Sequence, residues 1–237
     1  MRKILVSNDD GIFSDGIIRL ARLAKDYGDV WVVAPESQRS GYSHSITLRK
    51  PIDVWKVDFP VEGVEAYACS GTPADCIRLG VLNIMPEKPD LLLAGINDGY
   101  NVGTDIQYSA TAGCAFEGCF QKVHTIAFSE DNDGPHDVTD TYIRPILEEL
   151  MEKSAGINRV WNVNFPACPL EDYKGILYNR AVSLVDYYHD CYDGEPLEGG
   201  IIRFNVRGNR NDEGPEGTDI EAVLNNYISI GTVTNFQ

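Results

Sequence analysis

Between residues 1 and 170, short apolar runs alternate with longer segments in which apolar residues recur every three or four positions. An apolar run at 3–7 is followed by helical spacing over 15–27, and a second apolar run comes at 29–33. This order predicts a βαβ unit, in which two parallel strands are joined by a right-handed crossover.

The same alternation continues along the chain. Residues 45–58 alternate between apolar and polar side chains, which predicts a hairpin or an edge strand. Further strands are expected at 65–70, 89–95, 125–129 and 159–166, and further helices at 71–85, 109–120 and 139–153. Strands that alternate with helices predict an α/β sandwich with a mostly parallel sheet.

After residue 170 the pattern weakens, and glycine, aspartate, asparagine and aromatic residues mix. The stretches VSLVDYYHDCYDG and GGIIRFNV are typical of the two arms of a β-hairpin. We therefore divide the chain into an α/β domain at 1–170 and a C-terminal extension at 171–237. We expect this extension to pack against another subunit.

Charge and composition narrow the classes of partner and compartment. The chain has 36 Asp and Glu against 20 Lys and Arg, a formal charge of -16, which argues against a nucleic acid polymer or an anionic membrane as partner. Its six cysteines form no C-x-x-C pair and its first strand follows Lys3 directly, without a signal peptide pattern. No apolar run is long enough to cross a bilayer. These features predict a cytoplasmic protein.

Candidate chemistry lies in three polar loops, at 8–14, 34–44 and 96–108, each of which follows a predicted strand. Ligands of open parallel sheets bind beyond the carboxyl ends of the strands, so we expect the three loops to meet at one edge. The motifs G-x-G-x-x-G, Walker A and G-x-S-x-G are absent from the sequence. Their absence argues against a dinucleotide enzyme, a P-loop NTPase and a serine hydrolase.

The first loop contains Asp9 and Asp10 directly after a buried strand. Adjacent carboxylates repel each other, so either they face water in an ordinary turn or a cation lies between them. Two hard oxygen anions suit Mg²⁺, Mn²⁺ or Ca²⁺ better than Zn²⁺. The sequence N-D-D-G is also a good turn, and this motif alone leaves both interpretations open.

The other two loops are rich in groups that bind anions. Ser40 and Gly41 lie in the second loop, and Asn97, Asn101 and then Ser109, which opens a predicted helix, lie in or after the third. Hydroxyls, amides and a helix N-terminus suit a phosphate group. The alternative is that both loops are polar turns held by their own side chains. We interpret His44, in the second loop, as structural.

Together, four segments resemble the SurE family of survival proteins, which are metal-dependent nucleotidases. The segments are ILVSNDDGI, VVAPESQRSGYSHSIT, SGTPADCIRLG and PDLLLAGINDGYNVGTDIQYSATAGCAFEG, and they occur in the family's order. The resemblance covers most of residues 1–130 and implies a Rossmann-like three-layer α/β sandwich with a C-terminal β-rich dimerisation arm. The chain departs from the family pattern at Asp98, where a basic or small residue is usual, at Tyr100, and at Ala110.

The resemblance also implies the site. It places one divalent metal ion per subunit, most simply Mg²⁺ or Mn²⁺, on Asp9, Asp10, Ser40 and Asn97, and it places phosphate or substrate contacts on Gly41, Asn97, Asn101 and Ser109. Catalytic roles would fall on Asp9, as a candidate acceptor of the water proton, and on Asn101 and Ser109, which would hold the phosphoryl oxygens.

The function implied is hydrolysis of nucleoside 5′-monophosphates, and also of 3′-monophosphates, to nucleoside and phosphate by a homodimer or homotetramer. Two alternatives remain at this point. One is a polyphosphatase or another phosphomonoesterase, and the other is a non-catalytic module that binds a metal and a nucleotide.

Overall fold

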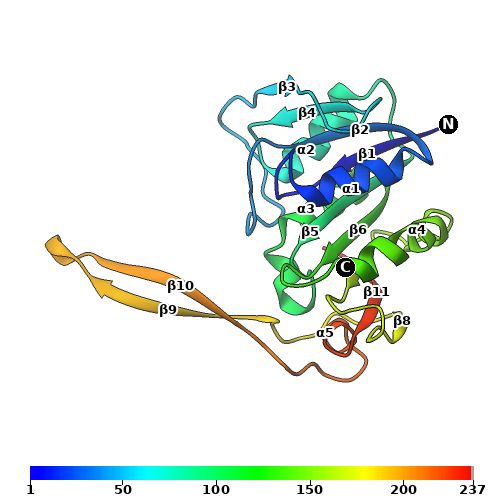
Figure 1. The fold of residues 1–237 in the computed structure, drawn as a ribbon. Helices are drawn as coiled ribbons and strands as arrows, with labels where there is room; N and C mark the ends of the chain where they lie inside the picture. The colour runs from blue at the N-terminus through cyan, green and yellow to red at the C-terminus, as the bar shows by residue number, and fades with distance from the viewer. Residues whose placement is uncertain (236–237) are drawn as a thin grey trace.

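A computed structural model describes residues 1–235 and places a nine-stranded sheet between two layers of helices (Figure 1). The strand order across the sheet is β3-β4-β2-β1-β5-β6-β7-β11-β8. The strands are β1 (Arg2–Ser7), β2 (Gly28–Pro35), β3 (Val54–Lys56), β4 (Glu65–Cys69), β5 (Leu91–Asp98), β6 (His124–Glu130), β7 (Val160–Phe165), β8 (Gly175–Tyr178) and β11 (Tyr227–Val233).

The strands from β4 to β7 run parallel, while β3 pairs antiparallel with β4, and β11 pairs antiparallel with β7. From β1 the chain moves outward to β2 and β4, and then returns to the other side of β1 to form β5. The connections that leave β1 and β5 therefore diverge, which opens a crevice at the carboxyl ends of these two strands.

The helices cover both faces of the sheet, because alternate residues of each strand point to opposite sides. Ile4 packs in one core with Leu20 and Ile146, whereas Leu5 packs in a second core with Ile77. Thus α1 (Asp15–Ala24) and α4 (Asp137–Met151) lie on one face, and α2 (Pro73–Leu79) and α3 (Ala110–Phe120) lie on the other. The predicted three-layer α/β fold is confirmed.

A long hairpin leaves the body of the molecule (Figure 1). Its arms are β9 (Tyr188–Pro196) and β10 (Ile202–Arg210), which pair antiparallel, so the predicted β-rich extension is present. The residues beyond 170 also supply β8, α5 (Asp219–Leu224) and β11 to the body, and β11 lies between β7 and β8 in the sheet. The segment after residue 170 therefore contributes both the arm and the last strands of the sheet.

Two local expectations from the sequence are wrong. The segment 96–108 is not wholly irregular, because β5 continues to Asp98 and a 3₁₀ helix forms at Gly103–Gln107. Strand pairing resumes after a register shift, with Asn97 opposite Ser129 and Asp98 opposite Glu130, so these polar residues end a strand. The helix expected at 71–85 ends at Leu79 and continues as a π-helical turn, Gly80–Ile84.

Within residues 1–235, no helix combines the length and the apolar character that crossing a membrane requires.

Candidate active site

The turn between β1 and α1 carries the aspartate pair and is held from two sides. The side-chain amide of Asn8 donates to the carbonyl of Gly11 at 3.1 Å and to the hydroxyl of Ser14 at 2.7 Å. The backbone N–H of Arg39, in the loop after β2, donates to the carbonyl of Asp9 at 2.7 Å. The second loop is thereby fixed against the first.

The side chains of Asp9 and Asn97 both contact the hydroxyl group of Thr111, which lies in the first turn of α3. The Thr111 hydroxyl donates to Asp9 Oδ1, and its oxygen lies 3.0 Å from Asn97 Oδ1. The Asn97 amide nitrogen donates to the carbonyl of Gly99 at 2.7 Å, which orients its Oδ1 toward Thr111. All three side chains are buried. Two oxygens that come from β1 and β5 are therefore aligned by a third element.

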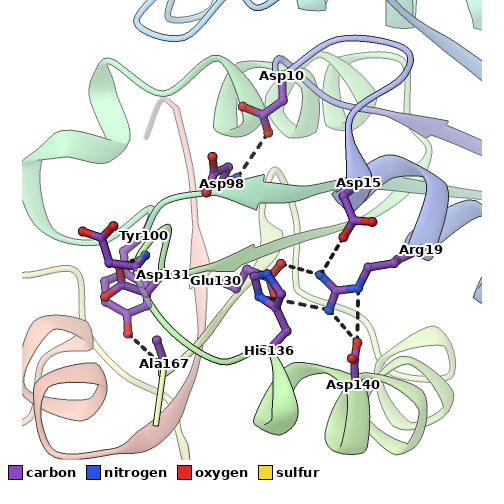
Figure 2. Close-up of polar contacts among 11 residues, drawn as sticks. Asp10, Asp15, Arg19, Asp98, Tyr100, Glu130, Asp131, His136, Asp140 and Ala167 are labelled. Carbon is purple, nitrogen blue, oxygen red and sulfur yellow. Dashed lines mark hydrogen bonds and ion pairs between the residues drawn. The ribbon is translucent and has the colours of Figure 1, made fainter.

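Asp10 turns to the side of β5. Its Oδ2 accepts the backbone N–H of Asp98 at 3.2 Å, as Figure 2 shows, and its Oδ1 is buried with no hydrogen-bond partner among the described residues. Burial and the neighbouring charge of Asp9 raise the pKa of Asp10 to about 7. Burial also raises the pKa of Asp9, against the opposing effect of hydrogen bonds from Thr111. Within residues 1–235, no lysine, arginine or histidine forms an ion pair with either carboxylate, so the negative charge of the two aspartates is not compensated there.

The residues present fit a divalent cation. An orphaned carboxylate oxygen on Asp10, a buried carboxylate on Asp9 and an amide oxygen on Asn97 are hard oxygen donors, which Mg²⁺ and Mn²⁺ prefer. No group of three or more His, Cys, Asp and Glu side chains in residues 1–235 is arranged to hold a metal ion. A cation here would accordingly depend on amide and hydroxyl oxygens beside the two carboxylates.

A cleft of about 1020 Å³ connects most of the predicted site residues. Six of the seven line it, from three separate segments of the chain: Asp9, Ser40, Gly41, Asn97, Asn101 and Ser109. The seventh, Asp10, lines a neighbouring cavity of about 330 Å³, and Asp98 borders both spaces. The structure therefore brings the three segments to one edge of the sheet, with Asp10 in a neighbouring cavity that Asp98 also lines.

Asn101 and Ser109 are held rigidly beside the cleft. The Asn101 side-chain amide donates to Ser129 Oγ at 2.8 Å, and its backbone N–H donates to Asn164 Oδ1 at 2.8 Å. Ser109 caps α3, because its Oγ accepts the backbone N–H of Ala112 at 3.0 Å and leaves its own hydroxyl hydrogen available. Both side chains are suited to donate hydrogen bonds to an anion in the cleft.

In the second loop, Gly41 has a φ of +77°, and a Cβ placed there would meet nothing within 4 Å. The backbone conformation, rather than crowding, accounts for glycine at this position. His44 lines neither cavity, and its Nε2 lies 2.9 Å from Glu117 Oε2, which agrees with a structural role.

Thr111 is the residue at this site that sequence reasoning missed. Its position two residues after the helix cap Ser109 was the available signal, because a hydroxyl in the first turn of a helix can reach the preceding loops. We expect Thr111→Val to weaken binding of Mn²⁺ by about ten- to a hundredfold, since it removes the hydroxyl that orients two oxygens of the predicted ligand set. Calorimetric titration with Mn²⁺ measures this, and Thr111→Ser, which keeps the hydroxyl, serves as the control. Equal affinities for the two variants would contradict the orienting role.

The fold and the cleft define a doubly wound α/β protein with a polar site where β1 and β5 diverge. The family model described as "Survival protein SurE" matches residues 4–185, and the chain belongs to this family. It is 37% identical to the 5′-nucleotidase SurE of Clostridium botulinum (strain Kyoto / Type A2), over 99% of this chain and 95% of that protein. It is 39% identical to the 5′-nucleotidase SurE of Thermosipho melanesiensis, over 98% and 91% of the two chains.

Among solved structures, the SurE protein from Aquifex aeolicus superposes with a TM-score of 0.81 at 34% identity. The match covers 98% of this chain and 93% of that one, so the hairpin and the last strands fall within its extent.

Proposed function

We propose that this protein is a divalent-metal-dependent 5′-nucleotidase that hydrolyses nucleoside 5′-monophosphates, and also 3′-monophosphates, to nucleoside and phosphate. The observation that carries the metal dependence is the pair of buried Asp9 and partly buried Asp10: the pKa values of both are raised, and Asp10 Oδ1 is buried with no partner among the described residues. The named activity of the relatives supports the choice of substrate.

In this proposal, Asp9, Asp10, Ser40 and Asn97 hold one Mg²⁺ or Mn²⁺ per subunit. Such an ion supplies neutralisation of the phosphate charge and a water of lowered pKa. Asn101 and Ser109 donate hydrogen bonds to phosphoryl oxygens, and Gly41, next to Ser40, contacts the phosphate in the cleft. Asp9 is placed to accept a proton from the attacking water, through the carboxylate oxygen that Thr111 does not occupy.

The test is release of phosphate from AMP with Mn²⁺ or Mg²⁺ and after treatment with EDTA. We expect EDTA to abolish turnover, because a phosphate dianion would otherwise meet two uncompensated carboxylates, and we expect added metal to restore it. Full activity in a metal-free preparation would contradict the metal dependence. Binding of AMP without turnover in any metal would favour a non-catalytic nucleotide-binding module.

We further propose that the β9–β10 hairpin joins subunits into a homodimer or homotetramer. Ile202, Phe204 and Val206 alternate along β10 and so share one face, and Tyr192 lies opposite Val206 on that face. These side chains are 58–65% exposed, and a two-stranded hairpin alone is only marginally stable in water. An exposed apolar stripe of this kind is typical of an interface.

The double variant Phe204→Ser, Val206→Ser should lower the molar mass measured by light scattering after size exclusion, because it removes half of this stripe. The control is Leu82→Ser, which alters a 59% exposed residue far from the hairpin in sequence. An unchanged mass for the double variant would assign the interface elsewhere.

The six cysteines are all free, which supports the proposal that the protein works in the reducing cytoplasm.

A further inference from the structure

The outer half of the cleft is acidic. Among its described lining residues there is no lysine or arginine, and beyond Asp9 it carries four aspartates, namely Asp98, Asp105, Asp186 and Asp190. The one histidine of the lining, His189, has its Nδ1 3.1 Å from Asp186 Oδ2. A ligand that extends outward from the predicted phosphate site therefore meets negative charge.

Two of these four carboxylates are compensated. Asp105 accepts the backbone N–H groups of Tyr187 and Tyr188, both at 2.8 Å, which fastens the root of the hairpin to the cleft. Asp186 has His189 as its neighbour. In the described part of the chain, Asp98 and Asp190 form no ion pair, and both are exposed.

Asp98 is the one of these two that lies beside the predicted metal ligands. It follows Asn97 at the end of β5, and its backbone N–H is held by Asp10. His136 lines the second cavity with Asp98, but its Nδ1 lies 3.1 Å from Glu130 Oε2. Arg19 is also paired with an acid, as Figure 2 shows, because its Nη1 lies 2.6 Å from Glu130 Oε1. Arg210 pairs with Asp131 at 3.0 Å. Asp98 thus borders the cleft with its backbone held by Asp10, and within residues 1–235 no ion pair offsets the charge of its carboxylate.

We propose that Asp98 is a specificity-determining residue that selects against substrates with a second anionic group next to the scissile phosphate, such as inorganic polyphosphate. This inference rests on the proposed function, because it assumes that the phosphate to be cleaved lies at Asn97, Asn101 and Ser109. A nucleoside leaving group is uncharged and escapes the repulsion, and Tyr108 offers it an exposed aromatic face in the same cleft.

The test compares kcat/KM for AMP and for tripolyphosphate at a constant concentration of free Mg²⁺. Asp98→Asn removes one negative charge within several ångströms of the bound substrate and should raise the ratio of kcat/KM for tripolyphosphate to kcat/KM for AMP about threefold. Asp98→Lys changes the charge by two and should raise this ratio about tenfold. The matched control is Glu62→Gln, which neutralises an exposed carboxylate that lines neither cavity and should leave the ratio unchanged.

A charge effect is also screened by salt, whereas a structural effect of the substitution is not. The difference in the ratio between wild type and Asp98→Asn should therefore shrink between about 0.05 M and about 1 M KCl. Two results would overturn the inference in a protein that still hydrolyses AMP. One is a tripolyphosphate-to-AMP ratio of kcat/KM that is equal in wild type and both Asp98 variants, and the other is a change in this ratio in Glu62→Gln as large as that in Asp98→Asn. Absence of AMP hydrolysis in the wild type would instead overturn the proposed function.

Discussion

Replacing Asp9 with asparagine should lower kcat/KM for AMP by about a thousandfold or more, even at high concentrations of metal. The Asp9 side chain is the most deeply buried of the predicted metal ligands. A bound metal ion contributes several kcal/mol of charge stabilisation in the transition state, and losing it lowers the rate by at least this factor. Phosphate release from AMP at saturating Mn²⁺ measures the effect.

The fold of Asp9→Asn should survive, because asparagine keeps the size of the side chain and an oxygen that accepts the Thr111 hydroxyl. Circular dichroism and the thermal midpoint in EDTA check this, and we expect the midpoint to be equal to or above that of wild type. The matched control is Asp193→Asn, on the exposed hairpin, which should retain wild-type kcat/KM. Turnover by Asp9→Asn at the wild-type rate would place the chemistry elsewhere.

Asp10→Asn should stabilise the metal-free protein at neutral pH. The pKa of Asp10 is about 7 in the folded chain, above its ordinary value, because of burial and the charge of Asp9. An acid whose pKa rises on folding binds more protons in the folded state, so stability is lost as pH rises from about 4 to about 7. A factor of ten in proton affinity corresponds to about 1.4 kcal/mol, so this loss amounts to about 4 kcal/mol.

Urea denaturation in EDTA at a series of pH values measures the free energy of unfolding of wild type and Asp10→Asn. The difference should be near zero at about pH 4 and should grow in favour of the variant up to about pH 7, because only wild type must ionise a buried carboxyl group. Mn²⁺ should then stabilise wild type far more than the variant, since metal binding requires the ionised form. A difference that does not depend on pH would contradict the raised pKa.

Much of the fold follows from local patterns in the sequence. The apolar run before Asn8, the helical spacing after Asp15 and the capping pair Thr72 and Asp75 each fix an element through residues close together in the chain. The parallel order of strands and helices then requires the loops after β1, β2 and β5 to share one edge. This is why Asp9, Asn97 and their partners were predictable as members of one site.

Local patterns did not predict which strands lie next to each other in the sheet or in which direction distant strands pair. An apolar run specifies a buried strand but not its neighbour, so the insertion of β11 between β7 and β8 depends on tertiary packing. The same holds for Thr111, which joins Asp9 to Asn97 across 102 and 14 residues of chain.

The sequence alone determined which residues make up the proposed site: two adjacent carboxylates at the end of a buried strand, and the hydroxyls and amides of two further segments. Only the tertiary structure decided how their charges are compensated. Within residues 1–235, it left an oxygen of Asp10 without a hydrogen-bond partner, and it placed Asp98 at the border of the cleft without an ion pair. The physical reason is that burial and the distance between charges arise from contacts between segments far apart in the chain, which a linear pattern does not record.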